Sequence, residues 1–159
     1  MSTPASIARH PVHPILVAFP IGLWVFSVAA DLIFQFGWGA TAWKDVAFYA
    51  LGGGIVCAVL AAIPGFTDFL SITDPRVRRV GVAHMVANLI GLLLFAVSFW
   101  LRWVDTVGFL PAAFSIFGLV ALIVGGWLGG ELVYVHNMGV TPARESSRSQ
   151  SSTSRRRIA

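Results

Sequence analysis

The sequence predicts an all-α fold: a four-helix transmembrane bundle with antiparallel neighbours and both termini on the same side. The first observation is composition, because 57% of the 159 residues are hydrophobic and only 11% are charged. Soluble domains carry about 25% charged residues. The second is that four apolar stretches each reach the roughly 20 residues that a membrane-crossing helix requires. The third is that these stretches are too long and too continuous for the strands of a membrane barrel.

The predicted spans, in chain order, are residues 14–36, 46–66, 80–101 and 109–135. The first begins at Pro14, which suits the first turn of a helix, and is interrupted only by Asp31. The connections between spans are short, so consecutive helices should run antiparallel. A cleaved secretory signal, with Arg9 as its basic end, is the alternative interpretation of the first span. That span is long for a signal.

The distribution of basic residues predicts the orientation. Four crossings place nine arginines on the side of the termini, against Lys44 and Arg102 on the other side. These nine are Arg9, Arg76, Arg78, Arg79, Arg144, Arg148, Arg155, Arg156 and Arg157. Cytoplasmic loops carry the excess of positive charge in membrane proteins. Both termini are therefore predicted to be cytoplasmic, and since topology explains the basic residues, nucleic acid is not expected as a partner.

The chain divides into three parts on this interpretation. Residues 1–12 form a cytoplasmic N-terminal segment, residues 13–138 the four-helix transmembrane domain, and residues 139–159 a tail rich in serine and arginine. The tail has too few large apolar side chains to bury a core, so we expect it to be disordered.

Polar side chains from four different helix ends are predicted to share one level near the cytoplasmic interface. Polar groups at this depth are costly and usually have a partner or a function. The predicted layer consists of His13, Asp68, His84, Glu131 and His136. Asn88 lies four residues after His84 and so shares its helix face. His10 is expected at the interface, while Asp31 lies about 27 Å from His13 along the helix, towards the outer side.

Three chemistries suit this layer. A haem could be held by two histidines from different helices, with His136 as the substitute for His13 or His84. A transition metal could be bound by His13 and His84 with Asp68 or Glu131 as a carboxylate ligand. A proton relay through the same groups is the third. The sequence contains no CxxCH, HExxH, Walker or nucleophile-elbow motif, so covalent haem attachment, hydrolase and ATPase functions have no support.

The fourth span contains two overlapping GxxxG patterns. Gly125 pairs with Gly129, and Gly126 with Gly130. Small residues four positions apart allow helix backbones to approach closely in lipid. Tight packing within the bundle is the favoured interpretation. A homo-oligomer interface is the alternative, and a wall that leaves room for a flat cofactor is a third.

Several motifs together resemble one bacterial family, the predicted four-helix membrane proteins catalogued as domain of unknown function family 2231. The resemblance covers about residues 10–140 and rests on HPVHPILVAFPIGL, Asp31, PGFTD, VAHMVAN and GGWLGGELVYVHNMGV. The segment that begins at Asn137 departs from the family pattern, which often reads His-Gly-Val-Gly-Val. A tight glycine turn is therefore not expected at Asn137.

The resemblance implies the four-helix architecture, a bacterial inner-membrane location and kinship with small b-type membrane cytochromes. It also implies a redox partner such as an iron–sulfur protein, because relatives are fused to Rieske-type domains. The motifs of the family correspond in this chain to His13, Asp31, Asp68, His84 and residues 126–134. The predicted function is a haem- or metal-binding component of membrane electron transfer. The alternative is a non-enzymatic transport or assembly subunit in which the polar residues form a structural network.

Overall fold

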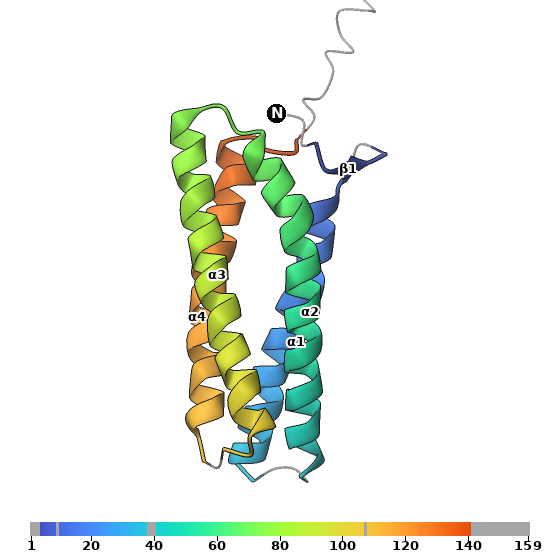
Figure 1. Cartoon of the computed structure of the whole chain (residues 1–159), viewed down its shortest axis with the longest axis vertical. Coiled ribbons are helices and arrows are strands. Elements are labelled where there is room, and N and C mark those ends of the chain that lie inside the picture. Colours follow the sequence, from blue (N-terminus) through green and yellow to red (C-terminus); the bar gives the residue numbers. More distant parts are fainter. Residues whose placement is uncertain (1–3, 9, 38–40, 107, 141–159) are drawn as a thin grey trace, which may run out of the picture.

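The computed structural model describes residues 4–8, 10–37, 41–106 and 108–140 (Figure 1). Its helices are α1 (Val12–Gln35), α2 (Ala42–Leu70), α3 (Pro75–Trp103) and α4 (Leu110–Gly130), and a short π-helix, η1 (Glu131–Val135), continues α4. Two short strands, β1 (Ser6–Ile7) and β2 (His10–Pro11), pair antiparallel before α1. The predicted four-helix bundle with antiparallel neighbours is confirmed.

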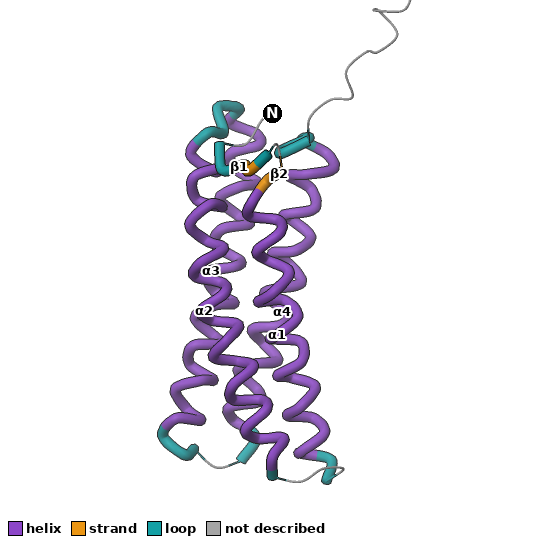
Figure 2. Tube along the Cα trace, turned by 90° about the vertical axis from the view of Figure 1, so that its right-hand side faces the viewer, coloured by secondary structure: helices purple, strands orange, loops and turns teal. Residues whose placement is uncertain are grey.

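The helices form two hairpins. α1 packs mainly against α2, and α3 mainly against α4, whereas contacts between the α1–α2 and α3–α4 hairpins are fewer. α1 and α3 run in the same direction (Figure 1). The two strands lie at the same end of the bundle as the α2–α3 connection (Figures 1 and 2). Most of the predicted tail, residues 141–159 with all of its arginines, lies outside the described residues, and so does Arg9.

Two helices are longer than the sequence predicts. α2 continues past Pro64 to Leu70, so Asp68 lies in its last turn and not after the helix. α3 begins at Pro75, because the Asp74 carboxylate accepts the Arg76 backbone N–H at 2.7 Å and proline suits the first turn. Hydropathy alone could not locate these ends, because the added residues are too polar to be counted as part of an apolar stretch.

All four helices are long and apolar enough to cross a membrane, with mean hydropathy between 2.0 and 2.3 in their most apolar windows. Large apolar side chains cover the outside of the bundle, including Phe19, Ile63, Leu93 and Ile123, which are all more than half exposed. Lipid is the solvent that such a surface requires.

The bundle interior is held by aromatic side chains against glycines. Trp24 of α1 and Phe95 of α3 stack with ring centres 4.1 Å apart, and both are buried. A Cβ atom at Gly54 would collide with Trp24, and one at Gly118 would lie 3.0 Å from Phe95. Each glycine therefore admits one ring between helices.

The chain turns after η1 despite the departure from the family pattern. Asn137 has a φ of 53°, and Gly139 has a φ of 73°. Asparagine tolerates this left-handed region better than most residues. The turn therefore forms with asparagine, and not glycine, at position 137.

Candidate functional site

His13 lies in the first turn of α1 and is fixed against α2. Its Nδ1 lies 2.8 Å from the Ala61 carbonyl oxygen. A Cβ atom at Gly65 would lie 2.7 Å from the imidazole. The ring therefore occupies space beside Gly65 that only a glycine leaves open. Gly65 follows Ala61, whose carbonyl contacts the ring, by one helical turn.

His84 is held by α4 in the same manner. Its Nδ1 lies 2.8 Å from the Gly125 carbonyl oxygen, and a Cβ atom at Gly129 would lie 3.0 Å from the ring. Asn88 lies over this imidazole: its Nδ2 is 3.2 Å from each ring nitrogen and donates to the His84 carbonyl at 2.8 Å. Gly125 provides space for this amide, because a Cβ there would lie 2.9 Å from Asn88.

These contacts determine the tautomer of both rings. A carbonyl oxygen only accepts hydrogen bonds, so each Nδ1 carries the proton and donates it. In the neutral form of either ring, the lone pair is then on Nε2. The two rings face each other across the hairpins, with centres 6.3 Å apart and planes at 88°. The structure thus brings His13, His84 and Asn88 together.

The remaining members of the predicted layer have other partners. The buried Asp68 carboxylate accepts the Ala5 backbone N–H at 3.0 Å and so ties the N-terminal segment to the end of α2. Oε1 of Glu131, the first residue of η1, lies 3.9 Å from Nε2 of His136, which directly follows η1. His10 is exposed, and its Nδ1 lies 3.0 Å from the Ala8 carbonyl. Among the described residues, no group of three or more His, Cys, Asp and Glu side chains could hold a metal ion.

The glycines of α4 divide between two directions. Gly125 and Gly129 face α3, where they contact Asn88 and His84. Gly126 has open space where a Cβ would be, and a Cβ at Gly130 would meet only Tyr134 of the next turn. The first GxxxG pair therefore packs inside the bundle and shapes the histidine site.

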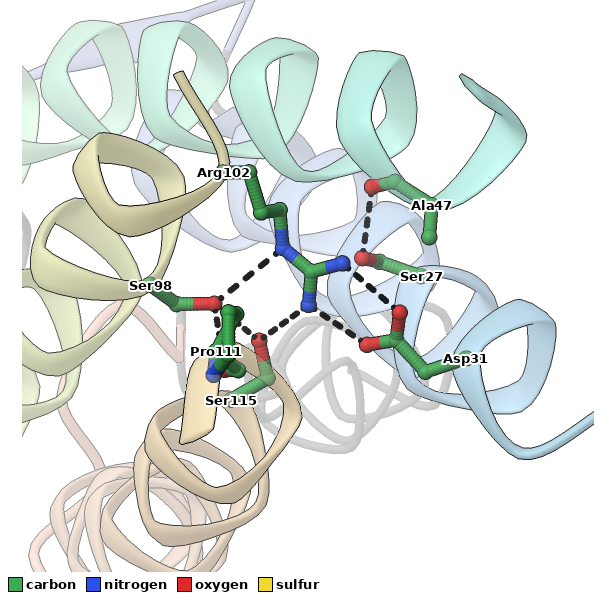
Figure 3. Close-up of polar contacts among 7 residues, drawn as sticks. All are labelled: Ser27, Asp31, Ala47, Ser98, Arg102, Pro111 and Ser115. Atoms are coloured by element: carbon green, nitrogen blue, oxygen red, sulfur yellow. Dashed lines mark hydrogen bonds and ion pairs between the residues drawn. The ribbon is translucent and has the colours of Figure 1, made fainter. Parts of the chain in front are cut away.

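A second polar cluster lies at the opposite end of the bundle, near the last residues of α1 and α3. Figure 3 shows its side chains and their contacts. Arg102 of α3 donates two hydrogen bonds to Asp31 of α1, at 2.7 and 2.6 Å. Its guanidinium also contacts Ser98 at 3.3 Å and Ser115 at 3.5 Å. Both charged side chains are largely buried, with 13% of Arg102 and 9% of Asp31 exposed. A bidentate pair of this kind joins the two hairpins firmly.

Asp31 stands out in the sequence as a charge within an apolar span, but its partner cannot be recognised from the residues around it. The signal is a shared spacing: Asp31 follows His13 by as many residues as Arg102 follows His84. Since α1 and α3 run in the same direction, equal spacing places each pair at a common level. In the sequence, Arg102 counts only as one of the two basic residues of the outer side, and its partners Ser98 and Ser115 belong to no recognisable motif.

Comparison with known protein families matches residues 9–142 to the family described as "Predicted membrane protein (DUF2231)". No curated protein and no solved structure matches the chain.

Proposed function

The chain belongs to the DUF2231 family of predicted membrane proteins, and from this premise we propose that it binds a haem or a transition-metal ion between His13 and His84. It would do so as a multi-pass component of membrane electron transfer in the bacterial inner membrane, with an iron–sulfur protein as a candidate redox partner. One observation carries this proposal: both imidazoles donate Nδ1–H to a backbone carbonyl.

Metal-ligating histidines almost always donate their second ring N–H to a carbonyl, a carboxylate or water. This hydrogen bond orients the ring and leaves Nε2 free as the ligand atom. Two metal–nitrogen bonds of about 2.0 Å would place the ring centres roughly 6 Å apart, and His13 and His84 are 6.3 Å apart. His13 and His84 would therefore hold a haem iron or a transition-metal ion through two imidazole nitrogens.

The chain's own residues prepare this site. Ala61 and Gly125 orient the imidazoles through their carbonyls, and Gly65 and Gly129 give the rings room. The bound group would supply a centre that accepts and releases one electron. Because Asn88 Nδ2 lies 3.2 Å from Nε2 of His84, its amide must turn aside for ligation.

An absorption spectrum of detergent-purified protein tests this proposal, recorded as isolated and after dithionite. We expect a Soret band that His84→Ala abolishes, or a near-stoichiometric transition metal by elemental analysis. His10→Ala is the matched control, since His10 is exposed and lies outside the ring contact. Protein that is colourless and free of metal would contradict the proposal.

A specific observation favours a second candidate, a non-enzymatic membrane subunit. Asp68, Glu131 and His136 have structural partners, and the Asp31–Arg102 ion pair joins the two hairpins. On this alternative the histidines are one more interhelical hydrogen-bond network, and His84→Ala lowers thermal stability without changing any spectrum.

A further inference from the structure

The two hairpins carry the same residues at equivalent places. Asp31 and Arg102 are 71 positions apart, and the same separation relates His13 to His84, Trp24 to Phe95 and Ser27 to Ser98. A constant separation also relates α2 to α4, linking Ala47 to Pro111, Gly54 to Gly118, Ala61 to Gly125 and Gly65 to Gly129.

The contacts within each hairpin repeat with the residues. The His13 contact to Ala61 O and the His84 contact to Gly125 O are both 2.8 Å long. The Ser27 hydroxyl donates to Ala47 O, and the Ser98 hydroxyl to Pro111 O, both at 2.7 Å. Every partner in the second hairpin is the counterpart of the partner in the first.

Counterparts also meet each other between the hairpins. His13 faces His84, Trp24 stacks on Phe95, and Asp31 pairs with Arg102. In a two-fold arrangement, a residue contacts its own counterpart only on the symmetry axis. Because α1 and α3 run in the same direction (Figure 1), this axis runs along the bundle.

We infer that residues 13–65 and 84–129 are two structural repeats of one helical hairpin, and that the ligand of the His13–His84 site lies on their two-fold axis. The position of the ligand rests on the proposed function, whereas the repeat does not. Binding sites of membrane proteins with internal repeats commonly lie where the repeats meet.

The axial position limits the ligand chemistry. A ligand shared by equivalent Nε2 atoms must offer two equivalent, opposed coordination positions, as a metal ion or a haem iron does. It binds once per chain, not once per hairpin. An organic molecule with two different ends would not present the same group to both histidines.

The repeats differ at two of the three places where counterparts meet, Trp24 with Phe95 and Asp31 with Arg102, whereas the two histidines are identical. The serine and two of the glycines that make contacts within each hairpin are also identical in both copies. On the axis, two identical charges would face each other and repel in a low-dielectric interior. Asp31 and Arg102 instead give opposite charges at equivalent positions, which favours pairing of the two different hairpins over two identical ones.

Titration with haemin, and separately with copper(II), tests the shared ligand in purified full-length protein. We expect one equivalent per chain. His13→Ala and His84→Ala should each weaken binding at least about tenfold and by a similar factor, while His10→Ala leaves it unchanged. If wild-type protein binds neither probe, the proposed function fails. If it binds a probe but needs only one histidine, the proposed function survives and the shared axial site is overturned.

An exchange across the axis tests the repeat without any ligand. Trp24→Phe combined with Phe95→Trp moves the indole to its counterpart position. There Gly118, the counterpart of Gly54, leaves room for the ring. The control exchange, Trp24→Phe with Phe99→Trp, has the same composition but lies off the axis. We expect the control to unfold at a temperature lower by about 4 °C or more than the axial exchange. Equal midpoints would overturn the repeat.

Discussion

Arg102 shows how one side chain can join separate parts of a membrane bundle. Its guanidinium donates to Asp31 of α1, to Ser98 of its own helix and to Ser115 of α4. Arginine suits this place because its donors form a planar fork that matches a carboxylate. In lipid, a buried charge without such partners is costly.

Replacing Arg102 with leucine should therefore destabilise the protein strongly. The substitution leaves the Asp31 carboxylate buried without its partner, a loss of about 3–5 kcal/mol in the free energy of unfolding. Adding Asp31→Leu should recover most of this loss, because no buried charge then remains. Unfolding by SDS titration in mixed micelles measures the difference.

The matched control is Lys44→Leu, at an exposed basic residue near the same end of the bundle. The Lys44 ammonium lies 5.0 Å from the centre of the Phe34 ring. An exposed cation–π contact contributes about 0.5–1 kcal/mol, so the effect should stay within about 1 kcal/mol. If Arg102→Leu proves equally mild, the ion pair does not contribute to stability in the way its geometry indicates.

At the scale of the helix, α4 shows why a glycine pattern is ambiguous in sequence. Gly126 and Gly129 belong to overlapping GxxxG patterns, yet only Gly129 faces His84. The rotation of a helix about its own axis depends on what it packs against. Hydropathy is nearly uniform around a membrane helix and does not report that rotation.

A pair of alanine substitutions should separate the two faces. Gly129→Ala places a Cβ about 3 Å from the His84 ring, so the imidazole must move and the contact with Gly125 O weakens. Gly126→Ala meets open space and should be neutral or slightly stabilising, because alanine favours helix by about 1 kcal/mol. Thermal unfolding and the spectrum of any bound haem give the comparison; equal effects would contradict the assigned faces.

Much of the fold and part of the site could be predicted from the sequence. Length and hydropathy were enough for four helices and their antiparallel order. The common level of His13 and His84 along the bundle followed from the antiparallel order of the spans, because both residues lie near helix starts on the same side. Asp68 and Glu131 could not be assigned, because their partners are a backbone N–H of the N-terminal segment and a histidine that directly follows the π-helix. These contacts depend on tertiary packing and not on local pattern.

For the whole molecule, the arrangement of charge is the remaining guide to orientation. The exposed Arg76, Arg78 and Arg79 lie in the first turns of α3, at the end that carries the histidine site. Trp100 and Trp103 are exposed at the opposite end, as interfacial tryptophans are. The histidine site is accordingly predicted to face the cytoplasm.

Reporter fusions test this orientation. Alkaline phosphatase fused after Ala159 should be inactive and green fluorescent protein at the same point fluorescent, because only the latter folds in the cytoplasm. The reverse pattern is expected for fusions truncated in the α3–α4 connection, after Asp105. A fluorescent fusion after Asp105 would show that the charge bias has been misinterpreted.

The separation of the two polar pairs also has a consequence for the surrounding membrane. Eighteen residues of helix between His13 and Asp31 span about 27 Å, close to the roughly 30 Å of a bilayer's hydrocarbon layer. A thicker bilayer would draw one of these pairs into acyl chains, and a thinner one would expose apolar helix surface to water. The protein should therefore be selective for lipid chain length, with the imidazoles and the ion pair defining the hydrophobic thickness that it matches.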